Sequence, residues 1–108
     1  ADNIRFTPAN DRTLFFAPYQ AGVAVQKLAV LTPEGVIEQL RISELAGRGG
    51  AFFPTWKKWD TCRTNTSPTK FIICNADEGE PGTFKDRVLL NNQPGSVLEG
   101  MIIAGFTV

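Results

Sequence analysis

The chain has 108 residues, enough for one small domain or for part of a larger one. Lysine and arginine together number 11, as do aspartate and glutamate, so the formal net charge is zero. A surface without excess positive charge argues against a dedicated nucleic-acid or acidic-lipid binder. No apolar run approaches the ~18 residues of a membrane span, and the N-terminus lacks a secretory signal pattern, so we expect no direct membrane insertion.

Histidine is absent from the chain, which excludes several kinds of site. Serine and cysteine nucleophiles paired with histidine, histidine-ligated zinc and imidazole acid–base catalysis all require it. The two cysteines, Cys62 and Cys74, are too few for a metal cage and have no C-x-x-C spacing. A disulfide between them is one interpretation, and two reduced thiols are the favoured one. We assign no metal site.

The apolar spacing predicts helices in the first half of the chain. Residues 1–17 are expected to form a short extended arm, and the loosely helical spacing over 19–31 predicts a helix. A second helix is predicted to begin with Thr32 as its N-cap and Pro33 at its first position, and to run to about Leu45.

Glycine and proline divide the second half into loops and short elements. Gly47–Gly50 breaks the helical pattern, and Pro54 predicts irregular chain after it. The elements predicted next are a polar loop over 63–69, a buried strand over 70–74, a loop over 79–82, a short helix from Thr83 to about Leu90, and an apolar helix from near Val97. We predict an N-terminal arm and helices over 1–45 and the start of an α/β domain over 46–108. Because the apolar last stretch has no cap or polar tail, we expect the chain to be part of a longer polypeptide.

The first segment with a chemical pattern covers residues 47–59. Its glycines let the backbone approach an anion, Arg48, Lys57 and Lys58 suit phosphate, and its aromatic side chains suit a planar ring. The pattern is neither a P-loop nor G-x-G-x-x-G, because Phe52 stands in place of the third glycine. Taken alone it favours a helix C-cap followed by a hydrophobic anchor loop. The lysines between two tryptophans also resemble a single-stranded nucleic-acid patch, which the zero net charge disfavours.

The second segment follows the predicted strand, where ligands of open α/β sheets bind. Its three carboxylates, at Asp77, Glu78 and Glu80, lie beside two glycines. Such acceptors suit ribose hydroxyls or the N–H groups of a flavin or nicotinamide. A solvated acidic loop whose charges pair with Lys85 and Arg87 is equally favoured by this pattern.

Together these segments resemble the flavoprotein subunit that oxidises NADH in respiratory complex I. The same subunit type occurs in NAD-reducing soluble hydrogenases and NAD-dependent formate dehydrogenases. The family pattern is roughly G-R-G-G-A-G-F-P-T-G-x-K-W, then a strand, then C-N-A-D-E-G-E-P-G-T-F-K-D-R, and the second motif is intact from Cys74 to Arg87. The resemblance covers about residues 20–108. It implies a Rossmann-like FMN-binding domain, an α/β fold of which only the first part is present.

The resemblance also implies roles for individual residues. On the FMN side it implies that Gly47, Arg48, Gly49 and Gly50 line the nucleotide pocket, that Lys58 reaches phosphate or ribityl oxygens, and that Asn75, Asp77 and Glu78 hydrogen-bond FMN. On the NADH side it implies that Phe53 stacks near adenine and that Glu80 lies near the nicotinamide end. No side chain is expected to be catalytic, because hydride passes from nicotinamide to flavin.

The same resemblance implies cofactors, partners and location. The cofactors are FMN and NAD(H), with a [4Fe–4S] cluster in the full-length subunit but not in this chain. The expected activity is that of an NADH dehydrogenase or diaphorase, which passes electrons on to iron–sulfur clusters in an NAD-reducing hydrogenase or complex I-like assembly. The partners are other subunits of the assembly, a small iron–sulfur subunit among them. The location is the cytoplasm, or the matrix or cytoplasmic face of a membrane complex, and the fragment alone is expected to be inactive.

Three positions depart from the family pattern. Phe52 and Trp56 replace glycines, and Ala46 stands where arginine is common. The two bulky replacements lie in the loop that should approach NADH. They leave open an alternative in which the chain is a non-catalytic relative that serves subunit assembly, its NADH pocket blocked by Phe52 and Trp56.

Overall fold

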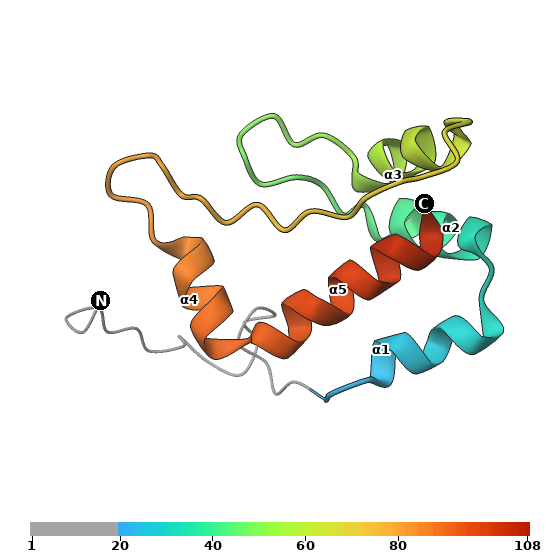
Figure 1. Cartoon of the computed structure of the whole chain (residues 1–108), viewed down its shortest axis with the longest axis horizontal. Helices are drawn as coiled ribbons and strands as arrows, with labels where there is room; N and C mark the ends of the chain where they lie inside the picture. Colours follow the sequence, from blue (N-terminus) through green and yellow to red (C-terminus); the bar gives the residue numbers. More distant parts are fainter. Residues whose placement is uncertain (1–19) are drawn as a thin grey trace.

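The computed structural model describes residues 20–108, which form short helices joined by long loops (Figure 1). In chain order these are α1 (Val23–Gln26), the 3-10 helix η2 (Lys27–Val30), α2 (Pro33–Ser43), α3 (Thr55–Thr64), α4 (Lys85–Asn92) and α5 (Pro94–Thr107). The arm predicted over residues 1–17 lies outside the described residues. Among the helices described, none has both the length and the apolar character needed to cross a membrane.

Helix α5 is the element on which the other α-helices pack. It contacts α1, α2, α3 and α4, and it runs diagonally through the middle of Figure 1. The helix begins at Pro94, earlier than the predicted start near Val97. Proline suits the first helical position because its fixed φ matches the helix and its missing N–H has no intrahelical partner there. Ala104 and Thr107 are buried where α5 packs on its neighbours.

The start of α2 confirms the predicted cap. The Thr32 hydroxyl oxygen accepts a hydrogen bond from the Gly35 N–H at 3.0 Å, and Pro33 occupies the first turn. Val36, on the following turn, is buried. The single helix predicted over 19–31 is instead two short pieces, α1 and η2, within the residues described.

Helix α3 occupies a segment for which the sequence predicts irregular chain, and that prediction is wrong. Pro54 is the N-cap, with extended backbone at φ −61° and ψ 124°. A proline at a helix start costs no intrahelical hydrogen bond, so here it begins a helix instead of preventing one. Half-buried residues recur along α3 at 55–56, 59–60 and 62–63. Half-buried positions that recur every three to four residues are the pattern of a helix that packs on one face.

The buried strand predicted over 70–74 is also wrong for the described part of the chain. The segment has no strand partner, and Phe71 and Ile73 are 78% and 82% exposed. A strand needs a neighbour to pair its backbone N–H and C=O groups, and residues 20–108 contain none. Ile72 instead lies against α5, where its side chain is 3.7 Å from the position a Cβ would take at Gly105. The described residues therefore show a helical arrangement and not a Rossmann-like α/β fold.

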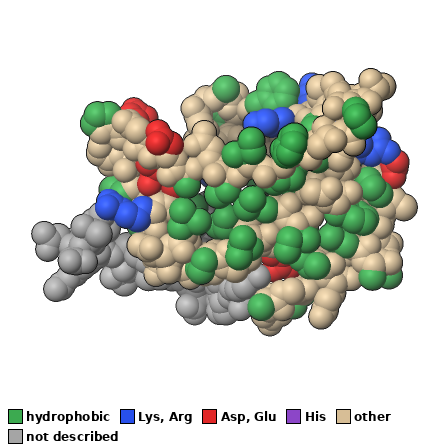
Figure 2. All heavy atoms as spheres, viewed as in Figure 1, with side chains coloured by type: hydrophobic (Ala, Val, Ile, Leu, Met, Phe, Trp, Pro, Cys, Tyr) green, Lys and Arg blue, Asp and Glu red, His purple; other side chains and the backbone are tan. Residues whose placement is uncertain are grey.

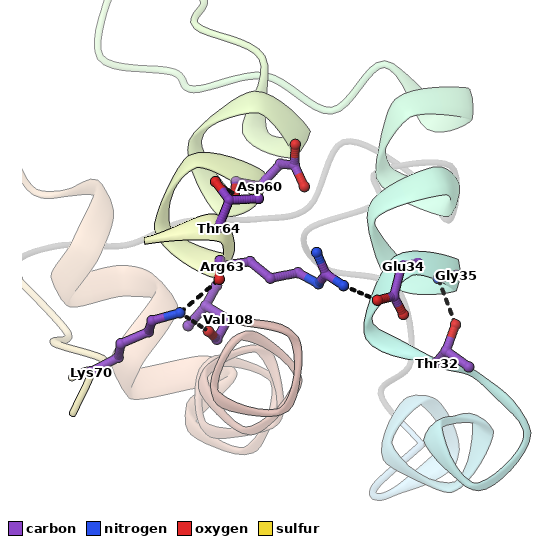
Figure 3. A network of polar contacts seen from close by, with 8 residues as sticks. All are labelled: Thr32, Glu34, Gly35, Asp60, Arg63, Thr64, Lys70 and Val108. Carbon is purple, nitrogen blue, oxygen red and sulfur yellow. Dashed lines mark hydrogen bonds and ion pairs between the residues drawn. The ribbon is translucent and has the colours of Figure 1, made fainter. Parts of the chain in front are cut away.

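Polar contacts join the C-terminal ends of α3 and α5 to the chain between them (Figure 3). The Lys70 ammonium donates to the carbonyl oxygens of Arg63 at 2.8 Å and of Val108 at 2.9 Å. The Arg63 guanidinium forms an ion pair with Glu34 of α2. Three helices are thus held together beside the segment that starts at Lys70.

Much apolar surface stays exposed on this arrangement. Val36 and Ala104 are the buried apolar residues among those described. Large apolar side chains on α5 and on the segment after Lys70 are exposed: Leu98, Ile102, Phe106, Phe71, Ile72 and Ile73. Figure 2 shows hydrophobic side chains gathered across the middle of the face in view, where α5 runs in Figure 1. Exposed apolar surface of this extent is typical of a contact surface.

Candidate functional site

The glycine loop, which we define as residues 47–53, lies between α2 and α3 and is closed at its base. The Gly47 N–H donates to the Phe53 carbonyl at 2.9 Å, and the Thr55 N–H donates to the Leu45 carbonyl at 3.0 Å. Ala46 and Pro54 form an isolated antiparallel bridge next to these bonds. The base therefore fixes where the loop leaves α2 and where it enters α3.

The sequence favoured a helix C-cap at these glycines, and the structure places the cap elsewhere. Helix α2 ends at Ser43, and Glu44 takes the left-handed conformation of the C-cap with φ 57°. The helix thus stops before Gly47 and slightly before the predicted end near Leu45. The aromatic side chains also do not anchor the loop, because Phe52 and Phe53 are 70% and 54% exposed.

Two residues of the glycine loop have positive φ angles. Gly50 has φ 109°, a conformation that favours glycine, and Phe52 has φ 51°. Gly49 differs, because a Cβ there would meet no atom within 4 Å. The loop is thus open around Gly49, and its backbone is reachable by a ligand.

Helix α3 places basic and aromatic side chains directly after the glycine loop. Lys57 and Lys58 are exposed near its start, and Trp56 is half-buried. The Lys57 ammonium lies 5.6 Å from the centroid of the Trp56 ring, within range of a cation–π contact. Positive charge beside an open glycine loop suits a phosphate group.

The acidic loop, residues 75–84, contains a tight turn. The Thr83 N–H donates to the Glu80 carbonyl at 3.2 Å, and Gly82 between them has φ 85°. Proline followed by a glycine of positive φ is the sequence of a type II turn. Further back, the Asn75 amide oxygen accepts from the Asp77 N–H at 3.2 Å.

Glu78 connects the acidic loop to α4. Its carboxylate accepts hydrogen bonds from the N–H groups of Asp86 at 2.8 Å and Arg87 at 3.0 Å, in the first turn of α4. Its backbone has φ 49°, in the left-handed region. The sequence predicted Thr83 as the cap of this helix, and that prediction is wrong, because Thr83 lies in the preceding turn and Glu78 provides the acceptors.

Lys85, at the start of α4, forms an ion pair within its own helix. The Lys85 ammonium is 2.9 Å from a carboxylate oxygen of Asp86. This hydrogen bond raises the pKa of Lys85, and the charges of Asp86, Glu78 and Glu80 act in the same direction against desolvation. The ion pair of Lys85 is thus made with Asp86 of α4 and not with an acid of the 75–84 loop, while Asp77 and Glu80 are exposed.

Each loop is organised by its own contacts. The hydrogen bonds described above for the glycine loop lie at its base, and those for the acidic loop run within residues 75–87. Exposed acceptors in the acidic loop and exposed cations after the glycine loop fit the hydroxyl and phosphate groups of a nucleotide. Cys62 and Cys74 are free thiols, and no cluster of three or more potential metal ligands occurs among residues 20–108.

Sequence reasoning missed two residues that join the helices to one another. Lys70 joins α3 to α5. Its signal in the sequence was a single lysine between the polar loop and the apolar residues 71–73. Glu99 is only 6% exposed and accepts hydrogen bonds from α1. Its signal was a single charge in the most apolar stretch of the chain.

Comparison with known proteins identifies relatives of this chain. A family model described as the Nuo51 FMN-binding domain matches residues 40–108. The alpha subunit of the NAD-reducing hydrogenase HoxS of Cupriavidus necator is 57% identical over 79 residues, covering 73% of this chain and 13% of that subunit. An NADH-quinone oxidoreductase subunit of Aquifex aeolicus is 46% identical over 85 residues, covering 79% of this chain and 20% of that subunit. The NADP-reducing hydrogenase subunit HndC of Solidesulfovibrio fructosivorans is 44% identical over 82 residues, covering 76% of this chain and 16% of that subunit. The chain spans a fifth or less of the length of these relatives.

Proposed function

Since the chain belongs to the Nuo51 FMN-binding domain family, we propose that it forms the first part of the nucleotide site of an electron-transfer subunit. The subunit passes hydride between NAD(H) and FMN, and then single electrons to iron–sulfur clusters, as an NADH dehydrogenase or diaphorase. The observation that carries the proposal is an open glycine loop followed by exposed cations on α3, inside the region that the family model matches.

The FMN side of the site combines the two loops. The backbone of Gly47–Gly50 and the Arg48 side chain line the pocket, where a ligand can approach because a Cβ at Gly49 would meet open space. Lys58 binds the phosphate or ribityl oxygens. The acidic loop provides Asn75, Asp77 and Glu78 for hydrogen bonds to FMN. The Glu78 carboxylate oxygens accept hydrogen bonds from N–H groups of α4, so α4 fixes the position from which this carboxylate binds FMN.

The NADH side of the site uses Phe53 and Glu80. The half-exposed Phe53 ring stacks near the adenine, and the exposed Glu80 carboxylate lies at the nicotinamide end. A negative charge there strengthens the binding of the positively charged NAD⁺. Bound FMN supplies the redox chemistry by accepting hydride, so the side chains bind and orient but transfer no proton.

The subunit belongs to a multi-subunit oxidoreductase in this proposal. The names of its relatives, subunits of NAD(P)-reducing hydrogenases and of NADH-quinone oxidoreductases, support an assembly of either kind. A small iron–sulfur subunit is the proposed neighbour, and the [4Fe–4S] cluster of the full-length subunit lies outside this chain. The assembly is placed in the cytoplasm, or at the matrix or cytoplasmic face of a membrane.

The visible spectrum of the natively purified protein, recorded without oxygen before and after adding NADH, tests the proposal. We expect a flavin band that bleaches on adding NADH. A flavin band that ignores NADH would instead support a non-catalytic relative that serves subunit assembly, with Phe52 and Trp56 blocking the NADH pocket. The absence of any flavin would refute the FMN site.

A further inference from the structure

Phe52 has a backbone conformation that its own side chain does not explain. Its φ of 51° lies in the left-handed region, which is unfavourable for a residue with a Cβ and is a marked outlier for a bulky one. The family pattern has glycine here, for which the conformation is free of strain. In this chain a residue with an aromatic ring adopts the conformation.

Burial within the chain does not offset this strain. The Phe52 side chain is 70% exposed, so little of its apolar surface is removed from water. The loop cannot easily relax, because the bond from Gly47 to Phe53 and the bridge between Ala46 and Pro54 close its base. Strained conformations that persist on a fixed scaffold are concentrated at ligand-binding positions.

The surroundings of Phe52 match one class of ligand. The neighbouring Phe53 ring is 54% exposed, and the exposed lysines Lys57 and Lys58 follow at the start of α3. Aromatic faces bind planar rings by stacking, and the ammonium groups attract phosphate. A ligand with a planar base and a phosphate group is complementary to both features, whereas an apolar protein segment would leave the cations unmatched.

We propose that Phe52 is a specificity-determining residue whose ring stacks on the adenine base of the bound pyridine dinucleotide. The inference rests on the proposed function and concerns one part of that site. It reverses the expectation that the bulky ring obstructs the pocket: the left-handed backbone presents the ring to solvent at the loop surface. Phe52 then favours ligands that carry an adenine over those that carry the nicotinamide half alone.

Kinetics of the full-length holoenzyme with two hydride donors test this role. The donors are NADH and reduced nicotinamide mononucleotide, which lacks the adenosine half, and the variants are Phe52→Gly, Phe52→Ala and Phe52→Tyr. We expect the KM for NADH to rise at least about fivefold in the Gly and Ala variants, because base–aromatic stacking typically contributes that much or more. The KM for the mononucleotide should stay unchanged, and Tyr should restore the wild-type value.

Phe52→Gly makes the test robust to folding failure, since glycine relieves the backbone strain at this position. FMN content per subunit, measured on every variant, reports whether the flavin site is intact. Equal increases in KM for both donors would overturn the inference, as would an unchanged or lower KM for NADH.

Binding of ADP, followed by titration calorimetry, separates this inference from the proposed function. ADP carries the adenine and phosphates but no nicotinamide, so its binding does not depend on hydride transfer. If the wild-type protein does not oxidise NADH but binds ADP at least about fivefold more tightly than Phe52→Gly, the stacking role holds and the proposed activity fails. Equal ADP affinity in both proteins refutes stacking, and loss of a partner subunit from the Gly variant with ADP affinity unchanged would show that a protein covers the ring.

Discussion

The carboxylate of Glu99 on α5 accepts a hydrogen bond from the backbone N–H of Val25 in α1, at 2.8 Å. Its other oxygen accepts from the N–H of Gly22, the N-cap of α1, at 3.3 Å. Glu99 is only 6% exposed, and a buried carboxylate is tolerated when N–H donors replace its lost water contacts. The Glu99 side chain therefore binds the N–H groups at the start of α1 and fixes this helix to α5.

Replacing Glu99 with alanine should detach α1 from α5. We expect the free energy of unfolding to fall by about 1–3 kcal/mol, because two N–H groups lose a charged acceptor in a partly buried place. Urea unfolding of the purified protein measures the change. Glu99→Gln keeps one carbonyl acceptor and should lose less. A Glu99→Ala protein as stable as wild type would contradict this assignment.

Glu78, and not Thr83, should control the stability of α4. Glu78→Ala removes both acceptors at the first turn of α4, at a cost of about 1–2 kcal/mol. Amide hydrogen exchange over Lys85–Asn92 should therefore accelerate about 5- to 30-fold. Thr83→Ala is the matched control, because Thr83 is the cap that the sequence alone predicts, and exchange in α4 should not change. Faster exchange in the Thr83 variant alone would reverse the two roles.

The caps show which part of the fold could be predicted from the sequence. The cap at Thr32 uses an acceptor close to the N–H groups it binds along the chain, so local sequence identifies it. The cap of α4 uses Glu78 from the other side of the type II turn, and the cap of α1 uses Glu99 from a distant helix. Acceptors that reach across a turn or between helices leave no local pattern, and this is why Thr83 was predicted instead.

The predicted strand failed for a related reason. Residues 70–74 have the apolar composition of a buried strand, but a strand is defined by its neighbour, and none exists among residues 20–108. Of the candidate site, the motifs and their order along the chain were readable, because they consist of consecutive residues. The left-handed backbone of Phe52 was not readable, because residues of its kind rarely adopt it.

Gly49 and Gly50 should respond differently to alanine. Gly50 has φ 109°, so Gly50→Ala should destabilise the protein by about 1 kcal/mol or more. Gly49→Ala introduces a Cβ that meets no atom within 4 Å, so the free energy of unfolding should stay nearly constant. If the Gly49 backbone contacts FMN, that variant should nevertheless lose flavin, which the absorbance ratio of flavin to protein measures. Full flavin content in Gly49→Ala would remove Gly49 from the proposed pocket.

Glu38 should titrate below its ordinary range. The hydrogen bond from Arg41, at 2.5 Å, lowers the pKa of Glu38 and raises that of Arg41, with their mutual attraction acting in the same direction. A carboxylate whose pKa is lowered on folding stabilises the protein above its unfolded pKa, and this contribution is lost as the pH falls through the folded pKa. Carboxyl NMR titration should show the pKa of Glu38 rising in Arg41→Gln and in high salt, because the pair is exposed and screened. An unchanged titration in the variant would exclude the pair in solution.

Lys70 should stabilise the packing of α3 on α5, because its long side chain brings a charged donor to carbonyl groups next to both helices. Its ammonium donates to the carbonyl of Arg63, near the C-terminal end of α3 where the helix dipole favours a cation, and to the carbonyl of Val108, next to α5 (Figure 3). Lys70→Met keeps the length of the side chain but removes the donors, and it should lower the free energy of unfolding by about 1–3 kcal/mol. The change is measured by urea unfolding.

Two further variants separate the Lys70 contacts from the nearby ion pair. Lys70→Arg keeps the charge and should retain part of the stability that the Met variant loses. Glu34→Gln removes the partner of Arg63 at an exposed carboxylate, so it should cost less than about 1 kcal/mol. Because Lys70 and Glu34 act on the same end of α3, the double variant should lose no less than Lys70→Met alone. A Met variant as stable as wild type would show that apolar packing alone holds these helix ends together.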